Sequence, residues 1–388
     1  MGKKRLTGVL MSLALAGGVL AGCNSSASGG GGSDTIKIGA NLELSGGVAS
    51  YGQSASEGLQ LAVEEINKKG IDGKKLKLIK VDNKSDAAEA TNAAIKLVSQ
   101  DKVAAIVGAA TSTNTLAQVQ VADDNKVVLV TPTGTNPTIT NKDGKVNEYV
   151  FRTCFIDPFQ GTVAANFASK ELNVKSAAVL IDSSSDYAKG LAAAFKTSFK
   201  KNGGKVVSQE AYVQKDTDFH AILTRIKASN PEFIFLPGYY EEVGLIVKQA
   251  RELGLDVPIM GGDGWDSPKL VDIAGKEALK NTYITNHYSS GDKDKKVQDF
   301  VSAFKKKYGK SPDAFSALGY DSGYFIADAI KRAKSSDPEK IKDALAKTDG
   351  LSLVSGKLKL DKNHDPIKSA VILEYVNGEQ TFKTKVNP

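Results

Sequence analysis

The chain has 388 residues, with 51 lysines and arginines against 44 aspartates and glutamates, so its formal net charge is +7. The lysines are scattered rather than massed with aromatic residues, which argues against a nucleic-acid-binding protein. Only two cysteines occur, and the role assigned below to Cys23 leaves Cys154 without a partner, so a disulfide-stabilised fold is excluded.

The N-terminal segment has the pattern of an export signal. Basic residues at positions 3–5 precede an apolar stretch, residues 6–21, which is too short for a comfortable membrane span. The stretch ends in Leu20-Ala21-Gly22-Cys23, which is similar to a bacterial lipobox. We therefore expect a signal peptide over residues 1–22 and lipidation of Cys23, which would anchor an extracytoplasmic protein to the cell membrane.

A short linker follows the expected lipidation site. Residues 24–33 contain only small and polar side chains, so nothing in them can drive burial. We expect residues 23–33 to form a flexible, lipid-anchored tether that is not part of the fold.

From residue 34 onward, the spacing of apolar residues alternates between that of strands and that of helices. This alternation predicts parallel α/β sheets with right-handed crossovers. A break near residues 151–158 separates two such series and suggests two lobes. In chain order, strands are expected at residues 35–40, 76–80, 103–109, 127–130, 177–181, 205–213, 232–236, 257–260 and 281–287, and helices at 59–66, 87–100, 112–125, 188–201, 219–229, 243–253, 297–308 and 321–334.

Polar loops follow five of the predicted strands, where ligands bind in open α/β sheets. The loops at residues 111–115 and 131–137 offer hydroxyl and backbone N–H groups without a carboxylate, which suits an anion. The loops at residues 182–187, 238–242 and 261–265 carry acids and aromatic rings, which suit an ammonium group and an apolar side chain. Together, the two sets predict an α-amino acid bound between the lobes.

Each loop also has a simpler interpretation. Serine and threonine after a strand are commonly helix caps, and an aspartate between glycines is often a turn residue. The tyrosines and Trp265 would line an aliphatic pocket or pack the lobes together. The predicted function therefore depends on the whole set of loops.

The chain from residue 34 to its C-terminus resembles the type I periplasmic binding proteins, in particular the leucine/isoleucine/valine-binding branch. The motifs that carry this resemblance occur in the family's order along the chain. They are Leu44-Ser45-Gly46-Gly47, Tyr51-Gly52, Val107-Gly108, Thr131-Pro132-Thr133-Gly134-Thr135-Asn136-Pro137, Phe151-Arg152-Thr153, Asp186-Tyr187, Gly238-Tyr239-Tyr240 and Gly261-Gly262-Asp263-Gly264-Trp265.

The resemblance implies a role for individual residues. Ser112 and Thr135 match positions that hold the ligand carboxylate, and the main-chain carbonyl of Thr133 matches an acceptor for the ammonium group. Either Glu242 or Asp263 matches the acid that faces this ammonium group, and the sequence leaves both open.

Further site residues follow from the same comparison and from the aromatic content of the loops. Tyr51 and Tyr187 match aromatic residues that close over the ligand. Trp265, with Tyr239 and Tyr240, is a candidate for the wall of the side-chain pocket.

The resemblance also implies a hinged, two-lobed fold in which each lobe is a mostly parallel sheet flanked by helices. The chain is expected to cross between the lobes three times, near Thr153, Trp265 and Gly356. The expected N-terminal lobe comprises residues 34–153 and 266–356, and the C-terminal lobe comprises residues 154–265 and 357–388.

The implied function is that of a solute-binding protein, a monomer without cofactor or metal, that delivers a free leucine, isoleucine or valine to the permease of an ABC importer. The alternative is a lipoprotein sensor for an amino acid or a related small amide or carboxylate. An enzyme is disfavoured because the three histidines, His220, His287 and His364, belong to no catalytic motif.

Overall fold

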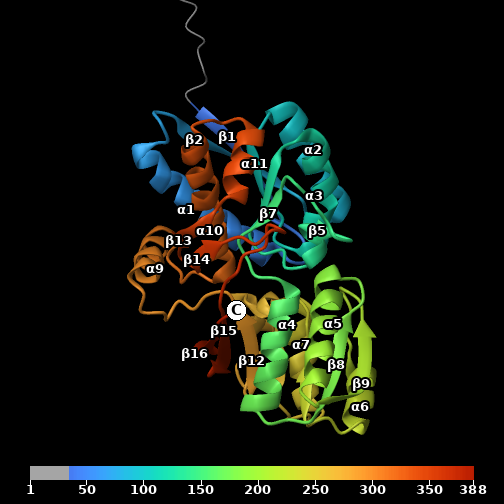
Figure 1. Cartoon of the computed structure of the whole chain (residues 1–388). Coiled ribbons are helices and arrows are strands. Elements are labelled where there is room, and N and C mark those ends of the chain that lie inside the picture. The colour runs from blue at the N-terminus through green and yellow to red at the C-terminus, as the bar shows by residue number, and fades with distance from the viewer. Residues whose placement is uncertain (1–34) are drawn as a thin grey trace, which may run out of the picture. The chain divides into compact units, whose positions relative to one another are not determined.

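The computed structural model describes residues 35–388, so the predicted signal peptide, Cys23 and the linker lie outside the described residues. The described chain forms two β-sheets with helices packed around them, and Figure 1 shows the five-stranded sheet above the seven-stranded one. No helix in residues 35–388 is long and apolar enough to cross a bilayer.

The first sheet is entirely parallel and pairs its strands in the order β2-β1-β3-β4-β7. Its middle strands are fully buried, as expected for a parallel sheet that is covered on both faces. The strands are β1 (Thr35–Leu42), β2 (Lys75–Asp82), β3 (Ala105–Gly108), β4 (Val128–Thr131) and β7 (Val150–Arg152). The helices around it are α1 (Ala49–Lys69), α2 (Ala87–Lys96), α3 (Ser112–Asn125), α10 (Ala314–Ala333) and α11 (Pro338–Ala346).

The second sheet pairs its strands in the order β16-β15-β12-β11-β10-β8-β9. The strands are β8 (Ser176–Asp182), β9 (Lys205–Tyr212), β10 (Phe233–Phe235), β11 (Ile259–Gly261), β12 (Thr282–Asn286), β15 (Ala370–Val376) and β16 (Glu379–Val386). The pairs β12-β15 and β15-β16 are antiparallel, and the other pairs are parallel. Its helices are α4 (Asp157–Asn166), α5 (Asp186–Lys201), α6 (His220–Ala228), α7 (Tyr240–Glu252) and α8 (Pro268–Ala274).

Smaller elements complete the described chain. Two hairpins are formed by β5 (Asn141–Lys142) with β6 (Lys145–Val146) and by β13 (Asp349–Leu353) with β14 (Gly356–Lys359). Helix α9 is Lys295–Tyr308, and short turns of other helix types are η1 (Leu97–Asp101), η2 (Pro137–Ile139), η3 (Phe167–Glu171) and η4 (Asp263–Trp265).

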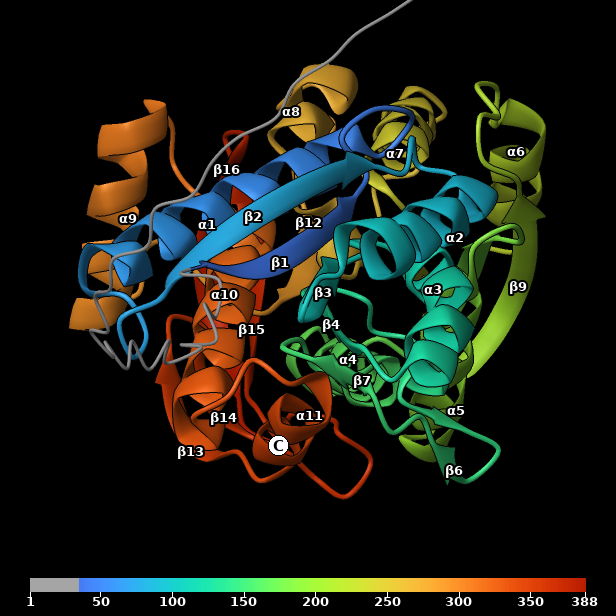
Figure 2. The same cartoon turned by 90° about the horizontal axis from the view of Figure 1, so that it is seen from above.

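Helices α1 and α10 lie side by side, although they are far apart in the sequence (Figure 2). Glycines allow this close approach, because a Cβ atom at Gly58 would lie 1.9 Å from the carbonyl oxygen of Ser316. A Cβ atom at Gly319 would likewise lie 2.2 Å from the carbonyl oxygen of Ala55. Small residues therefore form the contact between α1 and α10 instead of an apolar stripe. Because apolar spacing was the signal for a helix, the predicted starts at residues 59 and 321 lie later than the observed starts at Ala49 and Ala314.

The structure agrees with the predicted α/β class and with the two mostly parallel sheets. It corrects the expected crossing near Trp265. Strand β12 lies in the range assigned to the N-terminal lobe, yet it pairs with β11 and β15 of the second sheet. Helix α8, just after Trp265, packs against α7 of the same sheet. The chain therefore stays with the second sheet until residue 286.

Candidate functional site

A narrow cavity lies where carboxyl ends of strands from both sheets meet. Its free volume is about 10 Å³, which is about the space that one water molecule needs, so the walls must move apart to admit a solute. Loops after β3, β4 and β11 contribute to its wall, together with residues of α1, α5 and α10 and the residue before α7. The lining residues are Tyr51, Ala110, Thr111, Ser112, Thr133, Tyr187, Tyr239, Asp263, Gly264 and Phe315.

One wall of the cavity is the N-terminus of α3, which begins at Ser112. Its N-cap, Thr111, makes no side-chain cap bond, and the first turn contains no acidic residue. The first backbone N–H groups of a helix have no partner within the helix, and the helix dipole favours negative charge there. This wall is therefore suited to a carboxylate.

Glu43, which directly follows β1, holds this loop in place. Its carboxylate accepts hydrogen bonds from the backbone N–H groups of Ala110, at 2.9 Å, and Thr111, at 3.1 Å. It also accepts from the Thr111 hydroxyl, at 2.8 Å, and from the Asn114 amide, at 3.0 Å. A fully buried carboxylate is thus satisfied by donors of a single loop, which fixes the position of the α3 N-terminus.

The opposite wall carries Asp263. Its Oδ2 lies 2.9 Å from Nε2 of His287, while its Oδ1 is buried and has no hydrogen-bond partner among the described residues. Burial lowers the pKa of His287, so the ring is neutral at pH 7 and donates from Nε2 to the carboxylate. Asp263 therefore keeps one oxygen available to a cationic group in the cavity.

Tyrosine rings form the remaining wall. Tyr51 stacks on Phe315 with ring centroids 4.2 Å apart, and Tyr187 stacks on Tyr239 at 5.4 Å. Burial raises the pKa of Tyr51, Tyr187 and Tyr239 well above the usual value, so all three remain neutral. The wall combines apolar ring faces with neutral hydroxyl groups.

Hydrogen bonds close the cavity by joining elements of the two sheets. The Tyr51 hydroxyl donates to the carbonyl of Gly264 and accepts from the N–H of Tyr240 at 3.1 Å. The Asn136 amide donates to the carbonyl of Asp186 at 2.8 Å, and the Tyr240 hydroxyl donates to the carbonyl of Gly47 at 3.1 Å. The structure is thus that of a closed cleft.

We compared the chain with known protein families. Residues 35–380 match the family model described as periplasmic binding protein. The chain belongs to the periplasmic binding protein family. This confirms the resemblance predicted from the motifs, and the family is one of solute-binding proteins.

Several members of the family are similar over most of the chain. The leucine-, isoleucine-, valine-, threonine- and alanine-binding protein of Pseudomonas aeruginosa is 32% identical over 86% of this chain and 87% of its own. The solved structure of LivJ from Streptococcus pneumoniae, in complex with isoleucine, is 42% identical with a TM-score of 0.86, covering 91% of this chain and 100% of that one. The leucine-binding protein LivK of Thermotoga maritima is 40% identical with a TM-score of 0.86, covering 91% and 99%.

The structure of this family member brings Tyr51, Ser112, Thr133, Tyr187 and Asp263 together at the cavity. Their side chains are also tied to the protein. The Ser112 hydroxyl accepts from the N–H of Asn136 at 3.2 Å, and the Thr133 hydroxyl donates to the carbonyl of Ala110 at 2.6 Å. The loops of the first wall are thus fixed to each other before any ligand binds.

Three further predicted residues do not line the cavity: Thr135, Glu242 and Trp265. Glu242 accepts from the N–H of Lys215 at 2.8 Å and lines a separate cavity of about 380 Å³. Trp265 is fully buried and donates from Nε1 to the carbonyl of Leu236 at 2.9 Å. Trp265 therefore packs below the site rather than lining it.

Thr135 is turned into the interior by a buried arginine. Arg152 donates to the carbonyl groups of Gly134, at 2.6 Å, and Asn136, at 2.9 Å, on either side of it. Thr135 is fully buried, and its carbonyl accepts from the N–H of Asp157 at 3.0 Å. The residue that reaches the cavity from this loop is Thr133.

Glu43, His287 and Phe315 are parts of the site that were not predicted from the sequence. The rule used for the other loops could have identified Glu43, since it lies three residues after the strand predicted at residues 35–40 and directly after the observed β1. His287 and Phe315 belong to the C-terminal third of the chain, where no motif marked them. Their place depends on β12 and α10 packing beside elements far away in the sequence.

Proposed function

We propose that the protein binds one free branched-chain amino acid, leucine, isoleucine or valine, at this cavity between the two sheets and delivers it to the permease of an ABC importer. The observation that carries the proposal is the pairing of two opposite walls. A helix N-terminus without an acidic residue faces the cavity from one wall, and Asp263, with an unpartnered oxygen, faces it from the other. An α-amino acid presents a carboxylate and an ammonium group that match these walls.

In the proposed complex, the α3 N-terminus and Ser112 hold the carboxylate, while Asp263 and the carbonyl of Thr133 hold the ammonium group. Tyr51, Tyr187, Tyr239 and Phe315 contact the aliphatic side chain. The lining residues include no lysine, arginine or histidine that would select an acidic side chain. The names of the similar binding proteins, and the isoleucine in the LivJ complex, support this choice of ligand.

The proposal includes a hinge between two lobes. One lobe comprises residues 34–153 and 287–356, and the other comprises residues 154–286 and 357–388. The pairing of β12 within the second sheet supports this division. The amino acid would stabilise the closed form because it contacts both lobes only when they meet.

The proposed protein acts outside the cytoplasm as a monomer without a cofactor. The lipobox-like sequence before Cys23 supports a lipid anchor at the cell membrane. Such an anchor would keep the protein near the importer that receives its ligand.

A thermal-shift screen of the purified protein against the common free amino acids tests the function. Stabilisation grows with the ratio of ligand concentration to Kd, so leucine, isoleucine or valine should raise the Tm most. No shift with any of these three, together with a shift for another solute, would overturn the proposed ligand. Co-purification with a signalling partner instead of a permease would favour the sensor alternative.

A further inference from the structure

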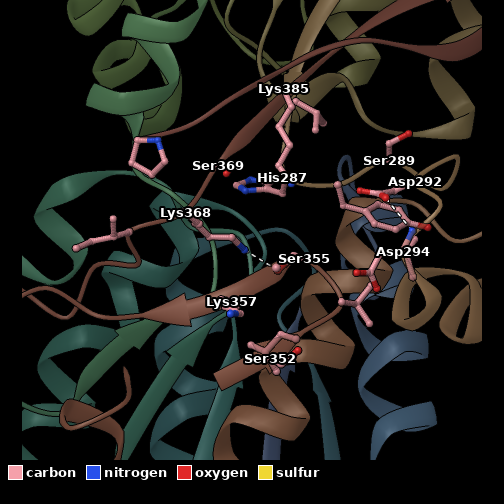
Figure 3. Close-up of a pocket in the computed structure, with 18 residues that line it drawn as sticks. His287, Ser289, Asp292, Asp294, Ser352, Ser355, Lys357, Lys368, Ser369 and Lys385 are labelled. Atoms are coloured by element: carbon pink, nitrogen blue, oxygen red, sulfur yellow. Dashed lines mark hydrogen bonds between the residues drawn. The ribbon is translucent and has the colours of Figure 1, made fainter. Parts of the chain in front are cut away.

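A second, larger cavity of about 320 Å³ lies beside the segments that connect the two sheets. We call it the hinge cavity. Its wall is formed by the chain after β12, the hairpin β13-β14, the loop before β15, and residues of β15 and β16. In Figure 3, Lys385 lies on one side of this cavity and Lys357 on the other, with His287 and Lys368 between them.

Three lysines line the hinge cavity: Lys357, Lys368 and Lys385. None of them takes part in an ion pair within residues 35–388. Lys357 and Lys385 are exposed, and their ammonium groups make no hydrogen bond to the described residues. The hinge cavity is therefore lined by three lysine ammonium groups, none of which has a carboxylate of the described chain within ion-pair distance.

Lys368 is the unusual member of the set because it is buried. Its ammonium group donates to the carbonyl of Thr153 at 2.9 Å and to the hydroxyl of Ser355 at 2.6 Å, which leaves one of its three donor hydrogens free. Burial lowers its pKa to about 8, and Asp321 opposes this change from a distance. A buried ammonium group without a close counter-ion is costly, so an anion beside it would be stabilising.

The negative groups of the wall are separate from the lysines. Asp292 and Asp294 lie toward one end of the cavity, away from Lys357 and Lys368 (Figure 3). Each already accepts a backbone hydrogen bond, Asp292 from the N–H of Asp294 and Asp294 from the N–H of Lys296. Because these two carboxylates repel an anion, an anion would bind at the other end of the cavity, beside the lysines.

We propose that the hinge cavity binds a small multivalent anion, a phosphate or a dicarboxylate, through Lys357, Lys368 and Lys385. Lysines bind both kinds of anion through point-charge attraction, so the two share one recognition chemistry. The hydroxyl groups of Ser355 and Ser369 at the same end already donate to Asp321 and Asn387, so the lysines supply the donors for the anion.

The position of the site predicts a coupling between the anion and the amino acid. The wall of the hinge cavity includes Ser352 and Ser355 of the first proposed lobe and the three lysines of the second, so an anion that contacts both sides joins parts of the two lobes. His287 lines the hinge cavity and bonds Asp263 of the first cavity. An anion would thus favour the closed arrangement and raise the affinity for the amino acid. This coupling rests on the proposed function, whereas the anion site does not.

The site is tested by isothermal titration of the purified protein with sodium phosphate and with sodium succinate, at an ionic strength fixed with sodium chloride. The titrations contain no amino acid, so their result is independent of the proposed function. We expect one saturable site for at least one of the two anions, and the anion that binds identifies the source. Binding of neither would overturn the proposal.

A charge-matched pair of variants distinguishes a built site from general attraction. Lys357→Ala combined with Lys385→Ala should weaken anion binding about tenfold or more, because two charged contacts are lost. Lys200→Ala combined with Lys331→Ala removes the same charge from exposed positions outside the cavity and should leave binding unchanged. Equal weakening in both double variants would overturn the site.

The coupling is measured by titrating isoleucine with and without a saturating concentration of the anion. A rise in isoleucine affinity of about fivefold or more is expected. The rise should vanish in the Lys357→Ala, Lys385→Ala variant. An affinity that is unchanged by the anion would contradict the coupling.

Discussion

His287 holds one oxygen of Asp263 and leaves the other unpartnered. The distance from Nε2 to Oδ2 is 2.9 Å, while Oδ1 is buried in the cavity wall without a hydrogen bond from the described residues. The ring of His287 is itself fixed, since it stacks on Phe155 with centroids 3.6 Å apart. The carboxylate is therefore oriented before a ligand arrives, which reduces the entropy lost on binding.

We predict that Asp263→Asn weakens amino-acid binding about tenfold or more, because the ammonium group loses a charge-assisted hydrogen bond. The variant keeps the size of the side chain, so its Tm without ligand should stay close to that of the wild type. Titration calorimetry with isoleucine measures the effect.

Glu242→Gln is the matched control, since it removes the other candidate acid. Glu242 lines a separate cavity, and we expect its variant to bind isoleucine as the wild type does. A large loss of affinity in Glu242→Gln, with none in Asp263→Asn, would reverse the assignment.

We predict that His287→Phe reduces the loss of stability on acidification. Burial lowers the pKa of His287, so below about pH 6.5 the unfolded chain binds a proton that the folded protein does not. The stability of the wild type therefore falls as the pH falls, by at most about 1.4 kcal/mol per pH unit for this group. The variant lacks this contribution but keeps an aromatic ring against Phe155.

Urea unfolding of both proteins at pH 7 and pH 5 measures this difference. Titrating groups that do not contact His287 have the same surroundings in both proteins, so they cancel in the comparison. The free energy of unfolding of the wild type minus that of the variant should be smaller at pH 5 than at pH 7. A difference that is equal at both pH values would show that His287 is not held neutral.

We predict that Tyr51→Phe weakens isoleucine binding several-fold without unfolding the protein. The Tyr51 hydroxyl joins α1 to Gly264 and Tyr240, so its loss should disfavour the closed form, while the stacking on Phe315 is kept. One hydrogen bond contributes about 1 kcal/mol, which corresponds to a change of about fivefold.

Tyr308→Phe is the control for Tyr51→Phe. Its hydroxyl also donates to a backbone carbonyl, that of Glu57 at 2.9 Å, but both residues pack around α1 and α9, away from the cavity. Isoleucine affinity should be unchanged in this variant. A similar loss in both variants would mean that the effect does not come from closure.

The sequence predicted the alternation of strands and helices and most of the cavity wall, because both follow from local rules. Ser112, Thr133 and Asp263 follow buried strands, and parallel strands bring their carboxyl ends to one edge. Side-chain direction within a loop was not accessible in this way. Thr133 reaches the cavity and Thr135 does not, because Arg152 fixes the carbonyl groups of the loop.

The parts that the sequence did not predict depend on distant packing. His287 reaches Asp263 only because β12 joins the second sheet beside β11. Phe315 reaches Tyr51 because α10 packs on α1 through glycines rather than through an apolar stripe. Periodicity reports the face that a helix buries, but it does not report which distant element covers that face.

Asp313, the N-cap of α10, gives a prediction about pH. Its carboxylate accepts from the N–H of Ser316 at 2.8 Å and from the hydroxyl of Ser54 at 2.7 Å. Burial, with repulsion from Asp266 as the second cause, raises its pKa to about 6. Between its usual pKa and pH 6, the folded protein binds more protons than the unfolded chain, so this group costs stability above about pH 6 and costs less as the pH falls.

We therefore predict that Asp313→Asn raises the Tm by a few degrees at pH 8 and by less at pH 4.5. Asparagine caps a helix as well as aspartate does, and it carries no charge against Asp266. The same substitution at the exposed N-cap Asp337 of α11 is the control, and its effect should depend less on pH. A change in Tm for Asp313→Asn that is the same at both pH values would show that the cap, and not the buried charge, accounts for it.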